Sequence, residues 1–218
     1  MIKKNKKLYD RLMSKVRPIL TAHYGETETA RLLRAMEPVY QRFLAETPFI
    51  GGKENMLAHN LDMAIPFFAL YEASGRALSK ELITGMLEAA HIQKYRKIGR
   101  WLDMNKLDRP WICALAHSAL KRAARKINNR KGGDWNNTWG IQDNPERHDH
   151  GIAMTLVGCP LADFAKKHGY MDILPILCDA DRQVTEAVHG RLIRHNTVAK
   201  GADRCDYWIV GDKDVTSK

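Results

Sequence analysis

The sequence predicts an α+β fold, with a helical N-terminal half packed on a small antiparallel sheet and with helices in the C-terminal third. Up to residue 130, apolar residues recur at helical spacing. From residue 151 onward, short β-rich runs alternate with short helical segments. A third observation is the length of 218 residues, with 44% hydrophobic and 28% charged residues, which excludes fibrous, disordered and disulfide-scaffold proteins.

No repeat and no linker composition divides the chain, so we expect one α+β domain over residues 1–218. Its parts would be a helical layer at 1–130, a tryptophan-containing loop at 131–150 and a motif-bearing α/β part at 151–218. We expect the loop to pack on the surface, and a role in covering a pocket is the alternative.

Four helices are predicted in the N-terminal half. Residues 26–46 and 54–73 carry apolar side chains at helical spacing, a third helix opens after Ser79 as its N-cap, and a fourth starts at Pro110. In the fourth, one apolar stripe is expected to be buried, formed by Ile112, Leu115, Ala119, Ala123 and Ile127.

Strands and helices are expected to alternate in the C-terminal third. The expected elements are a strand at 152–157, a helix at 160–168, a helix at 172–189 capped by Asp172, and hairpin strands at 192–198 and 205–210. Gly169 and Gly190 follow the two helices, as glycine commonly does at a helix C-terminus.

Membrane spans and secretion signals are not expected. The longest apolar run, residues 64–71, is far shorter than the roughly 20 residues of a spanning helix. No apolar segment follows the basic N-terminus, so we expect a cytoplasmic protein with no membrane partner and with free thiols. The four cysteines contain no Cys-x-x-Cys pair, which excludes zinc-finger and thioredoxin-type motifs.

Positive charge is concentrated in residues 94–131, which contain twelve Lys and Arg residues and only two acidic residues, Asp103 and Asp108. Such a block binds nucleic acid or another polyanion, or it forms a solvated helix face or a basic rim around an anionic substrate site. No nucleic-acid-binding motif accompanies it, so nucleic acid is the less expected partner. The Lys-rich cluster at residues 3–7 is expected to be a frayed, solvated end.

The predicted helix 172–189 carries a polar stripe beside its apolar stripe. Cys178, Arg182, Thr185 and His189 share this stripe, and Asp181 lies at its border. Because Asp181 follows Cys178 by three residues, its carboxyl group can reach the thiol, and a thiol beside a carboxylic acid is a usable nucleophile and proton donor. The alternative is a helix buried on two faces in which Cys178 is only packed.

The other cysteines compete for the same role. Cys159 precedes Pro160 at an expected helix start, where amide groups lower a thiol pKa, and its alternative is a buried strand end. Cys205 is expected to point inward from the last strand, and Cys113 to lie in the core. Residues 148–150 (His-Asp-His) offer metal ligands, but a solvated turn is favoured, and we expect neither a metal nor another cofactor.

The C-terminal third resembles the L-2-amino-thiazoline-4-carboxylic acid hydrolase family over about 60 residues. The motifs that carry the resemblance are Cys159-Pro160-Leu161, Cys178-Asp179-Ala180-Asp181, Arg194-His195-Asn196-Thr197-Val198-Ala199-Lys200-Gly201 and Cys205-Asp206-Tyr207. The resemblance implies hydrolytic opening of a small, anionic, cyclic isothiourea-like amino acid to a carbamoylated cysteine.

In the mechanism expected from this resemblance, the Cys178 thiolate attacks the amidine-like carbon. Asp181 protonates the departing ring atom and then activates water. Cys159 is the alternative nucleophile, and Cys205 helps to orient the reacting groups. The expected substrate-binding residues are Arg194, which would hold the substrate carboxylate, together with His195, Thr197, Asp206 and Arg182.

Two other functions stay open at this point. A non-catalytic small-molecule-binding or sensing module predicts stabilisation by ligand without turnover, whereas an enzyme predicts one thiol with a lowered pKa. A nucleic-acid-binding protein is the third possibility.

For the hydrolase, attack by a metal-bound hydroxide is the rival to the cysteine mechanism. A homo-oligomer is a possible assembly of the chain.

Overall fold

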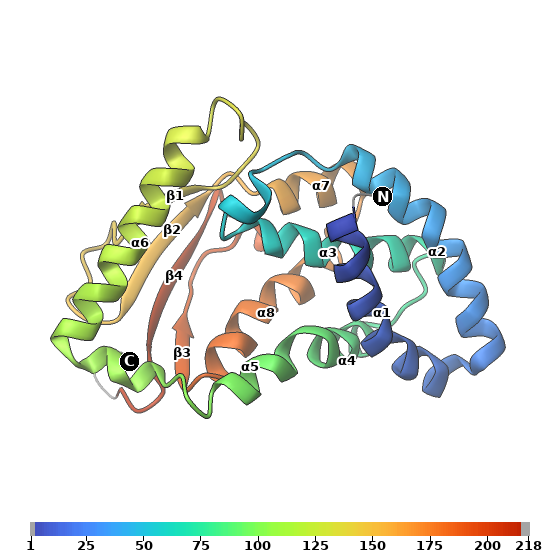
Figure 1. Cartoon of the computed structure of the whole chain (residues 1–218), viewed down its shortest axis with the longest axis horizontal. Helices are drawn as coiled ribbons and strands as arrows, with labels where there is room; N and C mark the ends of the chain where they lie inside the picture. The colour runs from blue at the N-terminus through green and yellow to red at the C-terminus, as the bar shows by residue number, and fades with distance from the viewer. Residues whose placement is uncertain (1–2, 215–218) are drawn as a thin grey trace. The chain divides into compact units, whose positions relative to one another are not determined.

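The computed structural model describes residues 3–214 and confirms the α+β class (Figure 1). Its elements, in chain order, are α1 (Lys3–Tyr24), α2 (Glu26–Glu46), η1 (Gly52–Glu54), α3 (Ala58–Ala73), α4 (Lys80–Leu87), the π-helical η2 (Glu88–Ile92), α5 (Gln93–Ile98), η3 (Met104–Asp108), α6 (Pro110–Arg130), β1 (Gly140–Asp143), β2 (Ile152–Val157), α7 (Pro160–His168), α8 (Leu174–Glu186), β3 (Gly190–Ile193), η4 (Val198–Lys200) and β4 (Arg204–Gly211). No helix within the described range is long and apolar enough to cross a membrane.

The chain divides into two compact units. The first comprises the described residues up to Thr47 together with His59–Gln93, and the second comprises Pro48–Ala58 and the described residues from Lys94 onward. Every predicted site residue belongs to the second unit. That the chain behaves as one domain stays a prediction.

The first unit is helical throughout. Its core is formed by fully buried side chains on α1 to α4, among them Leu20, Met36, Phe43, Phe68 and Met86. Ser79 caps α4 as predicted, since its hydroxyl accepts a hydrogen bond from the Leu82 amide at 3.1 Å. The predicted helix 54–73 begins later, at Ala58, because η1 takes up the residues just before it.

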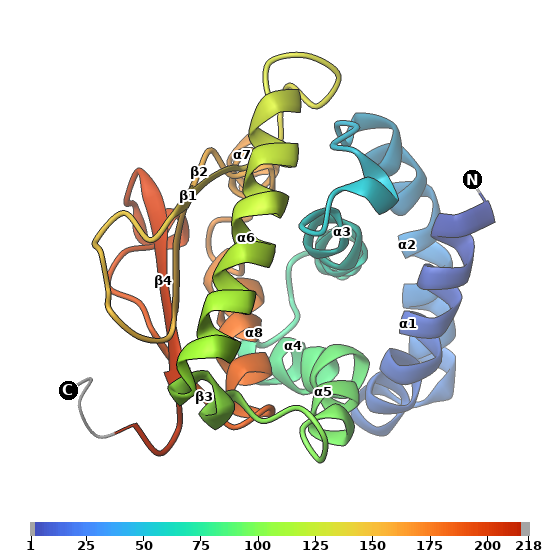
Figure 2. The same cartoon turned by 60° about the vertical axis from the view of Figure 1, so that its left-hand side comes forward.

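The second unit is built on a four-stranded antiparallel sheet in the order β1-β2-β4-β3. Helices α6 and α8 contact this sheet, and both lie on the same face of it (Figure 2). Side chains alternate between the two faces along each strand. Cys205, Tyr207 and Ile209 therefore share the helix-covered face of β4, whereas Asp206 and Trp208 lie on the opposite face.

Several predicted elements need correction. Helix α8 starts at Leu174, and Ile173 rather than Asp172 is its N-cap residue, without a side-chain cap. The strand predicted at 192–198 is displaced: β3 begins at Gly190 and ends at Ile193. Strand β1 was not expected, because it lies inside the segment predicted as a long loop. The Lys-rich N-terminal cluster is helical from Lys3 onward, in α1, rather than frayed.

The predicted apolar stripe of α6 is only partly correct. The helix begins at Pro110 as expected, and Ile127 is buried. Leu115 is 59% exposed, however, and the helix buries Leu120 and Ala124 instead. The stripe is therefore covered only in the C-terminal part of α6.

The tryptophan-containing loop is packed, as favoured by the sequence. Trp135 and Trp139 are buried, and Gly51 approaches the Trp135 ring so closely that a Cβ atom would lie 2.3 Å from it. The buried Asn55 side chain donates to the Ile50 carbonyl at 2.6 Å and to the Thr138 hydroxyl at 2.8 Å. Its amide oxygen accepts from a backbone amide at 2.9 Å.

Because these three hydrogen bonds are buried, we predict that Asn55→Ala lowers the free energy of unfolding by about 2–3 kcal/mol. Urea denaturation measures this change. Asn137→Ala, at an exposed position of the tryptophan-containing loop to which Asn55 is bonded, is the matched control and should change the stability by less than about 0.5 kcal/mol. Equal effects of the two substitutions would contradict an anchoring role for Asn55.

Candidate functional site

Two thiols and one carboxyl group lie around the Cys178 thiol, on the helix-covered face of the sheet. Cys159 lies at the start of α7, Cys178 and Asp181 lie on α8, and Cys205 lies on β4. Cys178 interacts electrostatically with each of the other three groups. The structure thus brings together all four residues that the sequence predicted as catalytic.

Asp181 is the most strongly hydrogen-bonded member of this cluster. Its Oδ2 atom accepts from the Tyr207 hydroxyl at 2.9 Å and from the Arg194 guanidinium at 3.2 Å. Arg194 also donates to the Cys178 carbonyl at 3.1 Å, and its guanidinium lies 5.3 Å from the centroid of the Tyr207 ring. Tyr207 and Arg194 therefore fix the carboxylate on one side.

Burial raises the pKa of Asp181, and the contacts with Tyr207 and Arg194 lower it only in part. The side chain nevertheless keeps 35% of its surface exposed. Asp181 is thus a carboxyl group of raised pKa that a small molecule can reach. This combination is typical of a general acid or base.

Burial also raises the pKa of the Cys178 thiol, and the neighbouring carboxyl group of Asp181 adds to the effect. The pKa values of Cys159, Cys205 and Cys113 are raised as well, each mainly by burial. The thiols are therefore protonated at neutral pH in the free protein. The lowered thiol pKa expected of an enzyme is absent among the four cysteines, all of which are free.

Cys159 shows why a helix start does not suffice to lower a thiol pKa. It lies at the start of α7 as predicted, and it caps this helix: its sulfur accepts a hydrogen bond from the Ala162 amide at 3.4 Å. This bond lowers the thiol pKa, and a hydrogen bond from Trp139 acts in the same direction. Burial outweighs both contacts and raises the pKa. Cys205 is inward-facing as predicted, and its sulfur accepts from the Val198 amide at 3.3 Å.

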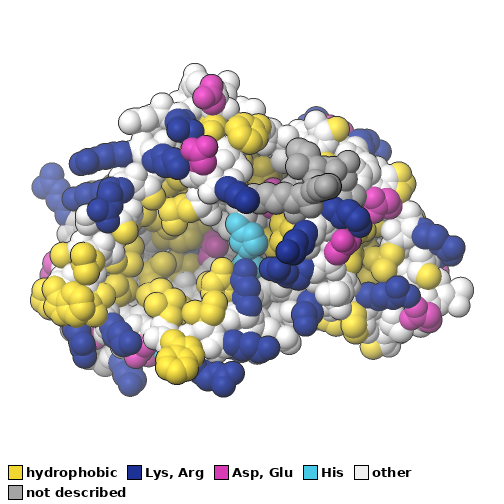
Figure 3. Space-filling view, viewed as in Figure 1, with side chains coloured by type: hydrophobic (Ala, Val, Ile, Leu, Met, Phe, Trp, Pro, Cys, Tyr) yellow, Lys and Arg dark blue, Asp and Glu magenta, His cyan; other side chains and the backbone are white. Residues whose placement is uncertain are grey.

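The surface is hollowed between α6 and α8, over the same face of the sheet (Figure 3). Hydrophobic side chains line this hollow. Such a lining suits a small organic ligand, because apolar walls exclude water from polar groups at the base of a site.

Three of the predicted substrate-binding residues, Arg182, His195 and Asp206, make their ion pairs and hydrogen bonds outside the thiol cluster. Arg182 points to solvent, where it forms ion pairs with Asp179 and Glu186, both at 2.7 Å. Asp206 lies on the opposite sheet face and accepts hydrogen bonds from the His195 and Asn196 amides.

His195 and Thr197 lie in the segment that follows β3. The His195 side chain is 77% exposed. Thr197 is buried and caps η4, since its hydroxyl accepts from the Lys200 amide at 3.2 Å. His195 and Asp206 line a small groove of about 70 Å³ together with Thr155 and Trp208.

Three aromatic residues were missed as members of the site. Tyr207 holds Asp181, Trp139 contacts Cys159, and Tyr95 of α5 interacts electrostatically with Asp181. Tyr207 could have been found, because it lies two residues after Cys205 on one strand and so shares its face. Trp139 and Tyr95 come from distant segments and carry no local signal.

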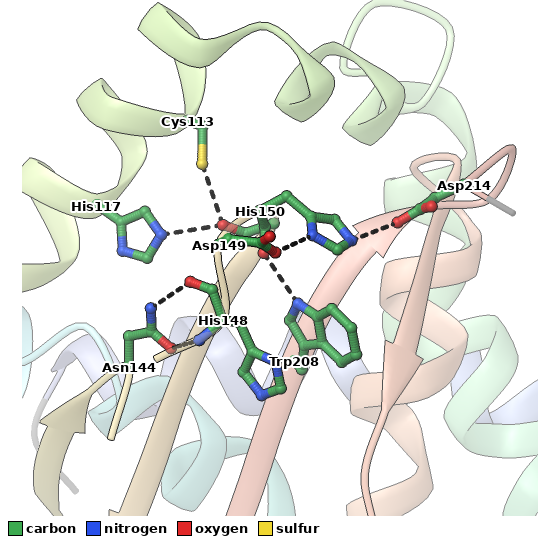
Figure 4. A network of polar contacts seen from close by, with 9 residues as sticks. Cys113, His117, Asn144, His148, Asp149, His150, Trp208 and Asp214 are labelled. Carbon is green, nitrogen blue, oxygen red and sulfur yellow. Dashed lines mark hydrogen bonds and ion pairs between the residues drawn. The ribbon is translucent and has the colours of Figure 1, made fainter. Parts of the chain in front are cut away.

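A second polar network surrounds the His-Asp-His segment (Figure 4). The two ring nitrogens of His150 contact Asp149 at 2.7 Å and Asp214 at 2.9 Å, while the His148 ring stacks on Trp208. Cys113 is half-buried rather than in the core, and its thiol donates to the Gly151 carbonyl at 3.2 Å.

A cavity of about 610 Å³ adjoins this network. Across residues 3–214, no group of three or more His, Cys, Asp or Glu side chains has the arrangement of a metal site. His150 of this segment, which lies in the loop before β2, instead connects the loop to Asp214 through a hydrogen bond.

The hydrogen bond to Asp149, supported by Asp214, raises the pKa of His150. Its stabilising contribution is therefore complete below the ordinary histidine pKa of about 6.5 and is lost as the pH rises through the higher, folded-state value. We predict that His150→Gln removes this part of the pH dependence of the urea midpoint above pH 6.5. A pH profile that is unaltered in His150→Gln would contradict the assignment.

Comparison with known proteins gives one finding. The model of the L-2-amino-thiazoline-4-carboxylic acid hydrolase family matches residues 59–209. No curated protein and no solved structure matches the chain. The matched range includes the three clustered thiols, Asp181, Arg194 and Tyr207, and it covers more than half of the sequence. The chain therefore belongs to the L-2-amino-thiazoline-4-carboxylic acid hydrolase family.

Proposed function

We propose that this protein is a hydrolase that opens a small cyclic amidine or isothiourea, such as L-2-amino-thiazoline-4-carboxylate. The observation that carries the proposal is the Asp181 carboxyl group, held by Tyr207 and Arg194 beside the Cys178 thiol and still partly exposed. Membership of the family supports the substrate class. We propose no cofactor for the reaction.

In the first step, Asp181 takes the proton of the Cys178 thiol, and the sulfur attacks the amidine carbon of the ring. The bond between this carbon and the ring sulfur breaks, and Asp181 returns the proton to the departing sulfur. The ring is then open, and its amidine carbon is bonded to Cys178. This order suits a buried thiol of raised pKa, because the base removes the proton only when substrate is present.

In the second step, Asp181 takes a proton from water, which attacks the same carbon. The Cys178 sulfur leaves and recovers the proton, and the product is a cysteine carbamoylated on nitrogen with a free thiol. One water is consumed overall. The raised pKa of Asp181 brings it closer to neutrality, where a carboxylate is a more effective base. Cleavage of the ring C–N bond would instead give a carbamoylated sulfur and a free amine.

A non-catalytic small-molecule-binding module is the second candidate function. The raised pKa of all four thiols favours it, because a resting thiolate is absent from the described residues. Such a module would show a raised melting temperature with the thiazoline carboxylate and no turnover. Mass spectrometry separates the two functions, since only the hydrolase adds one water to the substrate.

We predict that Asp181→Asn lowers kcat/KM by about 10²- to 10⁴-fold, because the amide can neither accept nor return the proton. Substrate turnover followed by mass spectrometry measures this. Glu186→Gln is the matched control on the same helix: its carboxylate pairs with Arg182 on the solvent side, and its kcat/KM should change less than about twofold. Equal losses in the two variants would refute the role of Asp181.

For Tyr207→Phe, we predict that the acid limb of the kcat/KM profile moves to higher pH. The Tyr207 hydroxyl lowers the pKa of Asp181, so its removal raises that pKa, and a higher pH is then needed to ionise the base. The pH–rate profiles of the two proteins test this. An unchanged acid limb with reduced kcat would assign Tyr207 to another step.

The covalent step has its own test. We predict that acid quenching during turnover traps an adduct on Cys178, with the mass of protein plus substrate, and that Cys178→Ala loses at least about 10³-fold in kcat/KM. Peptide mass spectrometry locates the adduct. If Cys178→Ala keeps full activity while Asp181→Asn is inactive, water attacks directly and the thiol is only packed.

A further inference from the structure

We propose that the second unit carries a surface that binds anionic phospholipid membranes peripherally. It lies at the end of α5 and the beginning of α6, and it is independent of the proposed hydrolase function. Its apolar members are the exposed large hydrophobic residues between positions 98 and 115, namely Ile98, Trp101, Leu102, Trp111 and Leu115. They are called here the Trp101–Trp111 surface.

The exposure of these side chains is unusual for a folded protein. Trp101 is 85% exposed and Trp111 is 61% exposed, although tryptophan has one of the largest apolar surfaces. The short helix η3 separates the two, and its Leu107 is buried, so the segment is anchored while both tryptophans face solvent. A group of exposed large apolar side chains marks an interaction surface.

The flanking side chains are basic. Lys97, Arg100, Lys106 and Arg109 are all exposed. The acidic residues of the block at 94–131 are Asp103 and the exposed Asp108, so the four exposed basic side chains outnumber them. Lys and Arg side chains accompany exposed hydrophobic patches over this part of the molecule (Figure 3). The surface is therefore complementary to a partner that is both apolar and anionic.

An anionic membrane fits this composition better than nucleic acid does. Tryptophan would stack on nucleic-acid bases, but Ile98, Leu102 and Leu115 gain nothing from stacking, whereas hydrocarbon accepts all of them. Tryptophan also favours the boundary between headgroups and acyl chains. A second copy of the chain fits worse, because it would bring two rims of equal positive charge together.

The physical expectation is shallow insertion with an electrostatic contribution. The tryptophans and aliphatic side chains would enter the boundary region, and the Lys and Arg side chains would contact phosphate groups of the lipids. Each basic side chain near an anionic surface strengthens binding about fivefold. This proposal departs from the sequence expectation of no membrane partner, which rested on the absence of a spanning segment.

Vesicle sedimentation with the full chain tests the proposal. The probe is phosphatidylcholine vesicles with and without phosphatidylglycerol. Binding is expected only to the anionic vesicles, and it should weaken with added salt. Trp101→Ala with Trp111→Ala should lower the partition coefficient at least about tenfold. Lys97→Gln with Arg100→Gln should lower it about tenfold or more and reduce the salt dependence.

The matched control is Phe49→Ala with Met56→Ala, which removes two exposed hydrophobic side chains of the same unit outside the basic block and should leave vesicle binding unchanged. Circular dichroism checks that every variant is folded. The proposal is overturned by absent binding to anionic vesicles, or by equal binding of the tryptophan variant and the control. It is also overturned if the tryptophan substitutions abolish self-association or binding of single-stranded RNA but leave vesicle binding intact.

Discussion

The alternation of side chains along β4 is the constraint on which the candidate site depends. Because neighbouring residues of a strand point to opposite faces, the contiguous residues 205–207 separate. Cys205 and Tyr207 face the helices, where Tyr207 holds Asp181. Asp206 faces the other side, where it binds the amides of His195 and Asn196. One short segment thus contributes Cys205 and Tyr207 to the thiol cluster and also fixes the turn after β3.

Burial affects the pKa of each titratable group discussed here, and so which of them holds its proton. It raises the pKa of Asp181, Cys178 and Tyr207 together, from ordinary values that are lowest for the carboxyl group. Contacts with Tyr207 and Arg194 lower the pKa of Asp181 in part, whereas burial keeps the thiol and the phenol protonated, so the carboxyl group is the acceptor of the cluster. One acceptor surrounded by donors is the arrangement expected of a general base, and it differs from a thiolate site activated in advance.

Sequence rules for helix starts and for strand alternation correctly predicted features that depend on neighbouring residues. The helix start at Cys159 follows from the proline after it and the inward-facing Cys205 from strand alternation, and the structure has both. Arg182 was expected beside Cys178, but its ion pairs with Asp179 and Glu186 keep it in solvent. Helical spacing gives neighbours on a helix and does not tell which stripe another element will cover. Contacts from Trp139 and Tyr95 depend on chain folding over long separations.

Helical spacing alone also failed to predict which residues of α6 are buried. The second unit, in addition, carries positive charge in two separate places. Apolar spacing predicted burial of Leu115, but burial requires a covering element, and the first turns of the helix leave this residue exposed. Arg194 is neutralised by Asp181, so its field beyond the cluster is weak. The exposed basic side chains of residues 94–131 carry the long-range attraction for anions. The proposed attraction of anions and the proposed hydrolysis therefore rest on different residues, and substitutions in one set should leave the other property intact.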